Sequence, residues 1–121
     1  MRLVQVAQHA DDLDRAEKFY SELLQASPTA RFDPPGLLFF DLDGVRLLLD
    51  HNAPTSLVYL QVDNVHETIE RIDGLAEVLS RPTVIFTHQD DTLGPAGYDE
   101  WQTFIRDCEG NSLGLVAFQR H

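Results

Sequence analysis

Apolar residues change their spacing along the first half of the chain. Residues 2–9 alternate between apolar and polar positions, which predicts a half-buried strand. In residues 10–28 the apolar positions recur at helical spacing instead, so we predict a helix there. Asp11 or Asp12 can cap its start, and Pro28 marks its end because proline cannot continue a helix.

Three short strands are predicted to follow this helix. They lie near residues 29–33, over residues 37–42 and over residues 45–50. Asp43 and Gly44, between the second and the third, are typical of a two-residue hairpin turn. Residues 51–56 have the composition of a linker.

The same order of elements starts again after the linker. Residues 57–62 alternate and predict a strand. Asn64 with Glu67 resembles a capping box, which would open a short helix that ends at Gly74. Further strands are predicted near residues 76–87, 100–106 and 111–118. Strand, helix and three strands therefore occur twice, as a repeat of architecture rather than of residues.

The repeat predicts an α+β fold made of two βαβββ modules. We expect one domain over residues 1–121, with module one at 1–52 and module two at 56–121. Each module can bury its helix against one face of a curved mixed sheet. The opposite faces are then free to curl around a cleft.

The charge balance restricts the choice of partner. Twenty acidic residues against nine Lys and Arg give a formal net charge of −11. Phosphate backbones and anionic membranes would be repelled, so we expect neither nucleic acid nor a membrane as a partner. A cationic ligand would be attracted, although the same charge can serve only to keep the surface solvated.

Composition also predicts a cytoplasmic globular protein. Hydrophobic residues make up 43% of the chain and charged residues 24%, which is ordinary for a soluble domain. No run approaches the roughly 20 apolar residues of a membrane span, and the N-terminus lacks the apolar core of a signal peptide. Cys108 is the single cysteine, which excludes an internal disulfide and a multi-thiolate zinc site.

Three segments of the sequence resemble signatures of the vicinal oxygen chelate superfamily, which includes glyoxalase I, extradiol dioxygenases and bleomycin-resistance proteins. They are DLDRAEKFYSELL (12–24), VYLQVDNVHETIERI (58–72) and RDCEGNSLGLV (106–116). All three stand in the order and spacing of the family and together cover nearly the whole chain. The resemblance implies a paired βαβββ, glyoxalase-like fold, usually a homodimer, with a ligand cleft in each curved sheet.

The resemblance also implies four metal ligands on the first, fourth, fifth and eighth strands. In this sequence the matching positions hold Gln5, Leu48, Leu57 and Gly114. Leucine and glycine side chains donate no electron pair, and one neutral amide does not hold a divalent cation. Shifting the alignment by one residue leads to further apolar side chains, namely Leu47, Leu49, Val58, Leu113 and Leu115. We therefore expect neither the metal of the family nor another cofactor.

Strand alternation predicts the residues that face the cleft. From these and the long loop we predict eight ligand-binding residues, Gln5, Arg46, Leu48, Asp50, Leu57, Tyr59, Trp101 and Gly114. A largely apolar face with a few polar groups is typical of a site for a small organic ligand, cationic or apolar. Gly114 would leave room for the ligand to approach the backbone. The alternative is that these side chains fill the cleft.

Residues 87–101 are too long for a hairpin turn and are predicted to form a lid or a binding loop. Within it, Tyr98 and Trp101 could close over an apolar ligand. His88 and its acidic neighbours carry donors for a cation or a proton, but we interpret them as part of a solvated acidic loop.

Three functions fit these observations. The leading hypothesis is a metal-independent, glyoxalase-like protein that binds or sequesters a small molecule as a homodimer. The first alternative is a lyase or dioxygenase-like enzyme with a non-standard site that uses Gln5, Asp50, Tyr59 or the His88 loop. The second is a structural dimer with a filled cleft. The sequence identifies no catalytic residue.

Overall fold

The computed structural model describes residues 1–120 and divides into two compact units. The first unit consists of Met1–Ser56 together with Cys108–Asn111, and the second takes the other described residues. The break after Ser56 falls at the end of the segment whose composition indicates a linker. The return of residues 108–111 to the first unit is not indicated by the hydrophobic pattern.

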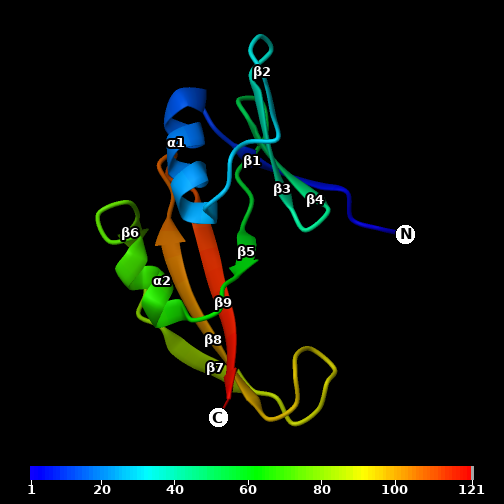
Figure 1. Cartoon of the computed structure of the whole chain (residues 1–121), viewed down its shortest axis with the longest axis vertical. Coiled ribbons are helices and arrows are strands. Elements are labelled where there is room, and N and C mark those ends of the chain that lie inside the picture. The colour runs from blue at the N-terminus through cyan, green and yellow to red at the C-terminus, as the bar shows by residue number, and fades with distance from the viewer. Residues whose placement is uncertain (121) are drawn as a thin grey trace. The chain divides into compact units, whose positions relative to one another are not determined.

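The first unit is a four-stranded sheet with one helix (Figure 1). Its elements are β1 (Gln5–His9), α1 (Leu13–Leu24), β2 (Ala30–Phe32), β3 (Leu37–Leu42) and β4 (Val45–Asp50). The strand order is β1-β4-β3-β2, with β1 parallel to β4 and the other pairs antiparallel. This is the predicted order of one module, strand, helix and three strands.

Helix α1 forms because its apolar residues share one face and both of its ends are capped. The Asp12 side chain accepts a hydrogen bond from the backbone N–H of Arg15 at 3.0 Å. Gln25 ends the helix in a left-handed conformation with φ of 53°. The core of this unit joins residues of the helix with alternate residues of β3 and β4, which are Leu13, Ala16, Phe19, Tyr20, Leu23, Leu38, Phe40, Leu47 and Leu49.

The second unit repeats the plan with a longer sheet (Figure 1). Its elements are β5 (Val58–Gln61), α2 (Val65–Arg71), β6 (Glu77–Val78), β7 (Thr83–Thr87), β8 (Tyr98–Arg106) and β9 (Ser112–Arg120). The strand order is β5-β9-β8-β6, and β7 also pairs with β8. The side chain of Asn64 caps α2 by accepting from the backbone N–H groups of His66 and Glu67. Helix α2 packs on β8 and β9.

The predicted α+β fold is confirmed, and several element boundaries differ from prediction, of which three affect the description of the sheets. Strand β1 begins at Gln5, so the alternation of the preceding residues does not extend the strand. The strand predicted near residues 76–87 is divided into β6 and β7. Pro82 lies between them and has no N–H to donate to a ladder. Strand β8 begins at Tyr98, which shortens the predicted loop to residues 88–97.

Buried polar side chains connect the linker and residues 108–111 to β1. Gln8 is fully buried and bonds both backbone groups of Ser56, donating to its carbonyl at 2.9 Å and accepting from its N–H at 2.6 Å. Asn111 donates to the carbonyl of His9 and accepts from the hydroxyl of Thr55. Among residues 1–120, no helix has the length and hydropathy to cross a membrane.

Candidate functional site

The open face of the second sheet is the face that α2 does not cover. Pairing places Tyr59 of β5 beside Gly114 of β9, and Gly114 beside Phe104 of β8. Side chains of residues directly paired in a sheet point to the same face. These three positions therefore form a row across three strands. We call this row the Tyr59 face, together with five further residues of the same side, which are Gln61, Glu100, Gln102, Val116 and Phe118.

Gly114 lacks a side chain because the ring of Tyr59 occupies that space. A Cβ atom added to Gly114 would lie only 2.6 Å from Cδ2 of Tyr59. The Tyr59 ring also contacts Phe104 edge to face, with ring centroids 5.9 Å apart. Tyr59 nevertheless stays 51% exposed. The result is a supported aromatic surface with one side open, which is the arrangement that stacking on a planar ligand requires.

A buried polar network lies farther along the same face. His88 Nε2 and Glu100 Oε1 are 2.9 Å apart, and Gln102 Nε2 donates to Glu100 Oε2 at 2.8 Å. His88 is only 3% exposed and packs between the rings of Phe86 and Phe118. The interpretation of His88 as part of a solvated loop is therefore wrong. The alternation of Glu100, Gln102 and Phe104 along one strand is the signal that could have identified this network.

The loop over residues 88–97 is held against this network. A Cβ atom on Gly94 would lie 2.8 Å from both the His88 ring and the Phe118 ring, so only glycine permits this approach. Within the loop, Asp90 accepts from the backbone N–H of Thr92 and Asp91 from that of Ala96. Both aspartates are exposed, as expected.

The corresponding face of the first sheet carries a polar pair on an aromatic ring. Arg46 Nε donates to Gln5 Oε1 at 3.0 Å, and its guanidinium lies 5.9 Å from the centroid of Phe39. Leu48, also on this face, is buried. Asp50 accepts from the backbone N–H of Asn52 and so supports the turn after β4. The structure thus brings Gln5 and Arg46 together, as predicted.

Trp101 requires a correction. It pairs with Ala117, which lies on the opposite face of the sheet from Gly114. Its ring contacts His66 of α2, with centroids 4.8 Å apart. Trp101 therefore packs under the helix, and its prediction as a ligand-binding residue is wrong because the register of β8 turns it away from the Tyr59 face. Leu57 precedes β5 and is half exposed.

The metal ion implied by the family resemblance does not fit the side chains at its four positions. The one polar group, the Gln5 amide oxygen, already accepts a hydrogen bond from Arg46. Leu48 and Leu57 have no donor atom, and the Tyr59 ring fills the space beside Gly114. A divalent cation needs several charged or strongly polar ligands to replace its water.

Solved structures share this fold at low sequence identity. A glyoxalase/bleomycin resistance protein/dioxygenase superfamily member from Sphaerobacter thermophilus DSM 20745 matches with a TM-score of 0.72 and 15% identity, over 97% of each chain. A lactoylglutathione lyase from Agrobacterium tumefaciens matches with a TM-score of 0.63 and 24% identity, over 96% of this chain and 92% of that one. A glyoxalase/bleomycin resistance protein from Albidiferax ferrireducens T118 gives 0.65 and 16%, over 95% and 98%.

Sequence comparison assigns the family directly. No curated protein sequence is significantly similar to the chain. The model of the Glyoxalase/Bleomycin resistance protein/Dioxygenase superfamily matches residues 2–115, which is nearly the whole chain. This match agrees with the three signature segments and with the two repeated units of the fold. The chain therefore belongs to the glyoxalase/bleomycin resistance protein/dioxygenase superfamily.

Proposed function

We propose that this protein binds a small, planar organic cation on the Tyr59 face and does so without the metal ion of its family. The observation that carries the proposal is the half-exposed ring of Tyr59, which lies against Gly114 and contacts the ring of Phe104 edge to face. A ring held in this way loses little conformational freedom on binding, so contact with a ligand is gained at small entropic cost. Binding or sequestration is the function that such a face supports best.

The preference for a cation rests on ring chemistry and on charge. The face of a tyrosine ring carries negative potential and attracts a cation by about 0.5–2 kcal/mol, depending on desolvation. The net charge of −11 raises the local concentration of cations around the whole chain. Glu100 places a carboxylate on the same face, although His88 and Gln102 already bond it. A planar aromatic cation would use both the ring contact and the charge.

Three probes test this proposal on protein that is kept free of metal ions by EDTA. Proflavine is a planar aromatic cation, naphthalene-2-sulfonate is a planar anion, and tetramethylammonium is a cation without a ring. We expect proflavine to bind most tightly by fluorescence titration. Tyr59→Ala should weaken it at least about tenfold, whereas the control Tyr59→Phe, which keeps the ring, should bind nearly as wild type. Equal binding by wild type and Tyr59→Ala would refute the proposal.

A second function is favoured by the His88–Glu100 pair. A histidine paired with a carboxylate, buried beside an open face, is the usual form of a general base. The protein would then be a lyase or isomerase whose active-site residues differ from those that the family resemblance implies. The test is exchange of C–H protons into D₂O for a panel of 2-oxo and 2-hydroxy acids, followed by NMR. Exchange that wild type catalyses and His88→Gln does not would favour the enzyme over the binding protein.

We also propose that the protein is a homodimer in the cytoplasm. Several large apolar side chains are more than half exposed in the single chain, namely Leu3, Phe32, Leu57, Ile85, Phe86 and Leu93. Exposed apolar surface of this extent commonly marks a protein interface. A dimer that binds none of the three probes would favour the structural alternative, in which the cleft is filled.

A further inference from the structure

A cluster of two histidines and one aspartate lies in the first unit and shares no residue with the Tyr59 face. We propose that His9, Asp11 and His51 bind a divalent transition-metal ion such as Zn²⁺. The three residues stand at the end of β1, just before α1 and just after β4. None of them is among the four positions where the family places its ligands, and the proposal does not depend on the proposed binding function.

The donor atoms converge on one oxygen. His9 Nε2 lies 3.1 Å from Asp11 Oδ1, and His51 Nδ1 lies 2.9 Å from the same atom. The two imidazole rings have their centroids 6.0 Å apart. Ligand atoms around a tetrahedral zinc ion lie about 3.3 Å from one another, since each is about 2.0–2.1 Å from the metal. Both histidine–Asp11 distances are within a few tenths of an ångström of this separation, and the exposed His51 ring would have to turn toward His9 to complete the set.

The hydrogen bond on the other side of His9 sets its tautomer. His9 Nδ1 lies 3.0 Å from the carbonyl oxygen of Ala53. A carbonyl only accepts, so Nδ1 carries a hydrogen, and Nε2–H of the protonated ring donates to Asp11. A metal ion would displace the Nε2 proton and take up the lone pair, while Nδ1–H stays on the carbonyl. A backbone carbonyl or carboxylate that holds the second nitrogen in this way is the regular companion of a metal-ligating histidine.

Hydrogen bonds within the first unit order the backbone around Asp11 in the metal-free protein. Glu109 accepts from the backbone N–H of Asp11 and is itself bonded by Nε and Nη2 of Arg15 at 3.0 and 2.6 Å. Its side chain is only 1% exposed. His9 pairs with Asp50 in the β1–β4 ladder, which fixes the strand end that His51 follows. An ordered backbone lowers the entropic cost of placing the three ligands.

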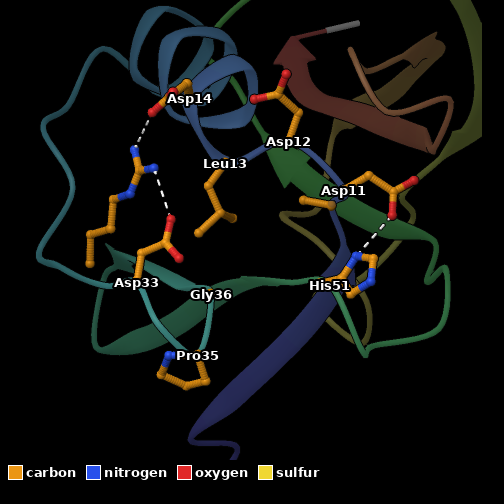
Figure 2. A pocket seen from close by; sticks show the side chains of 10 residues that line it. Asp11, Asp12, Leu13, Asp14, Asp33, Pro35, Gly36 and His51 are labelled. Atoms are coloured by element: carbon orange, nitrogen blue, oxygen red, sulfur yellow. Dashed lines mark hydrogen bonds and ion pairs between the residues drawn. The ribbon is translucent and has the colours of Figure 1, made fainter.

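The site opens to solvent on one side. Asp11 and His51 line a cavity of about 530 Å³, and Figure 2 shows their side chains directed toward one another at its edge. Asp12, Asp14 and Asp33 line the same cavity and make its field negative, with Arg31 bridging the last two. Water can therefore complete the coordination. Two imidazole nitrogens favour zinc, nickel or copper over magnesium or calcium, which prefer oxygen ligands.

The test is a calorimetric titration with ZnCl₂ of protein that has been stripped of metal by a chelator and then dialysed to remove the chelator. We expect one equivalent of Zn²⁺ to bind to wild type and the affinity to fall at least about tenfold in His51→Gln, which replaces an exposed side chain without disturbing the core. His66→Gln is the matched control and should bind as wild type. With Co²⁺ as the probe, wild type should give the visible absorption of a site with fewer than six ligands.

The outcomes separate this site from others. Loss of binding in Gln5→Leu with full binding in His51→Gln would place the ion at the family position and overturn the proposal. Absence of stoichiometric Zn²⁺ binding by wild type would overturn it as well. Tyr59→Ala should leave Zn²⁺ binding unchanged, so the result is independent of the proposed function. Circular dichroism melting of each variant identifies any loss of binding that results from unfolding.

Discussion

The absence of a side chain at Gly114 makes room for the ring of Tyr59. The glycine lies inside β9, where a larger residue would normally add to strand stability. It is kept small by the ring beside it, because any Cβ atom would overlap that ring. The space that the family resemblance would assign to a metal ligand is here occupied by an aromatic ring.

Gly114→Ala should lower the free energy of unfolding by about 1–2 kcal/mol, because the added methyl group forces the half-exposed Tyr59 ring out of position. In a Tyr59→Ala background the same change should be neutral or stabilising, since alanine restricts the unfolded chain more than glycine does. Urea denaturation of the four proteins of this cycle measures the difference. An equal cost in both backgrounds would show that the ring is not what excludes the side chain.

Asp90 reports whether the loop over residues 88–97 is ordered in solution. Hydrogen bonds from the side chain and backbone of Thr92 hold the pKa of Asp90 below its ordinary value of 3.8. A lowered pKa means that these bonds stabilise the folded protein above that value and are lost as pH falls through the folded-state pKa. Thr92→Val should raise the pKa toward 3.8, as followed by NMR of the carboxyl carbon. A wild-type pKa at or above 3.8 would mean that the turn does not persist.

Element ends, rather than element centres, carry the long-range connections of this fold. Gln8 of β1 bonds both backbone groups of Ser56, and so fixes the path of the chain where the first unit ends. Both partners would otherwise remain part-buried polar groups without a bond. The Gln8 side chain therefore bonds the backbone N–H and C=O of Ser56, which a neighbouring strand would otherwise do.

Gln8→Leu should cost about 3 kcal/mol of unfolding free energy, because it leaves two backbone groups of Ser56 without partners at about 1–3 kcal/mol each. Gln5→Leu is the matched control on the same strand. Gln5 is only partly buried and bonds the exposed Arg46 side chain, so its loss should cost less than about 1 kcal/mol. Equal losses in thermal or urea unfolding would contradict this account of the linker.

Periodicity was sufficient to predict both helices, most of the strands and the repeat, because these features depend on the local spacing of apolar residues. It predicted Tyr59 and Gly114 as members of one face for the same reason. The prediction for Trp101 is wrong because it places this residue in the loop, whereas Trp101 lies inside β8, where alternation with Gln102 and Phe104 places it on the opposite face. Alternation could have placed Glu100 and Gln102 on this face, but not the burial of His88 beside them, because that burial results from a loop that folds back through Gly94.

At the scale of the whole molecule, two features bear on the proposed binding of a cation. The positions of the family metal hold side chains that cannot bind one, and the net charge of −11 favours positively charged ligands. Binding of a cation to the Tyr59 face should therefore weaken as salt is raised from 20 to 300 mM, since screening reduces the attraction between distant charges.

Solution mass tests the proposed assembly. The chain has a mass of 13.7 kDa, and light scattering should give about twice this value because the exposed apolar side chains favour association. Replacing the half-exposed Phe86 by serine is a first variant for locating the interface. A monomer at all accessible concentrations would contradict the proposed homodimer.

The most direct test of metal-independent binding at the Tyr59 face is an NMR titration of ¹⁵N-labelled protein with proflavine in the presence of EDTA. We predict saturable shifts of the backbone amides of Tyr59, Phe104 and Gly114, which Tyr59→Ala abolishes. Saturable shifts confined to another surface, or shifts that occur only after a divalent metal is added, would contradict the account.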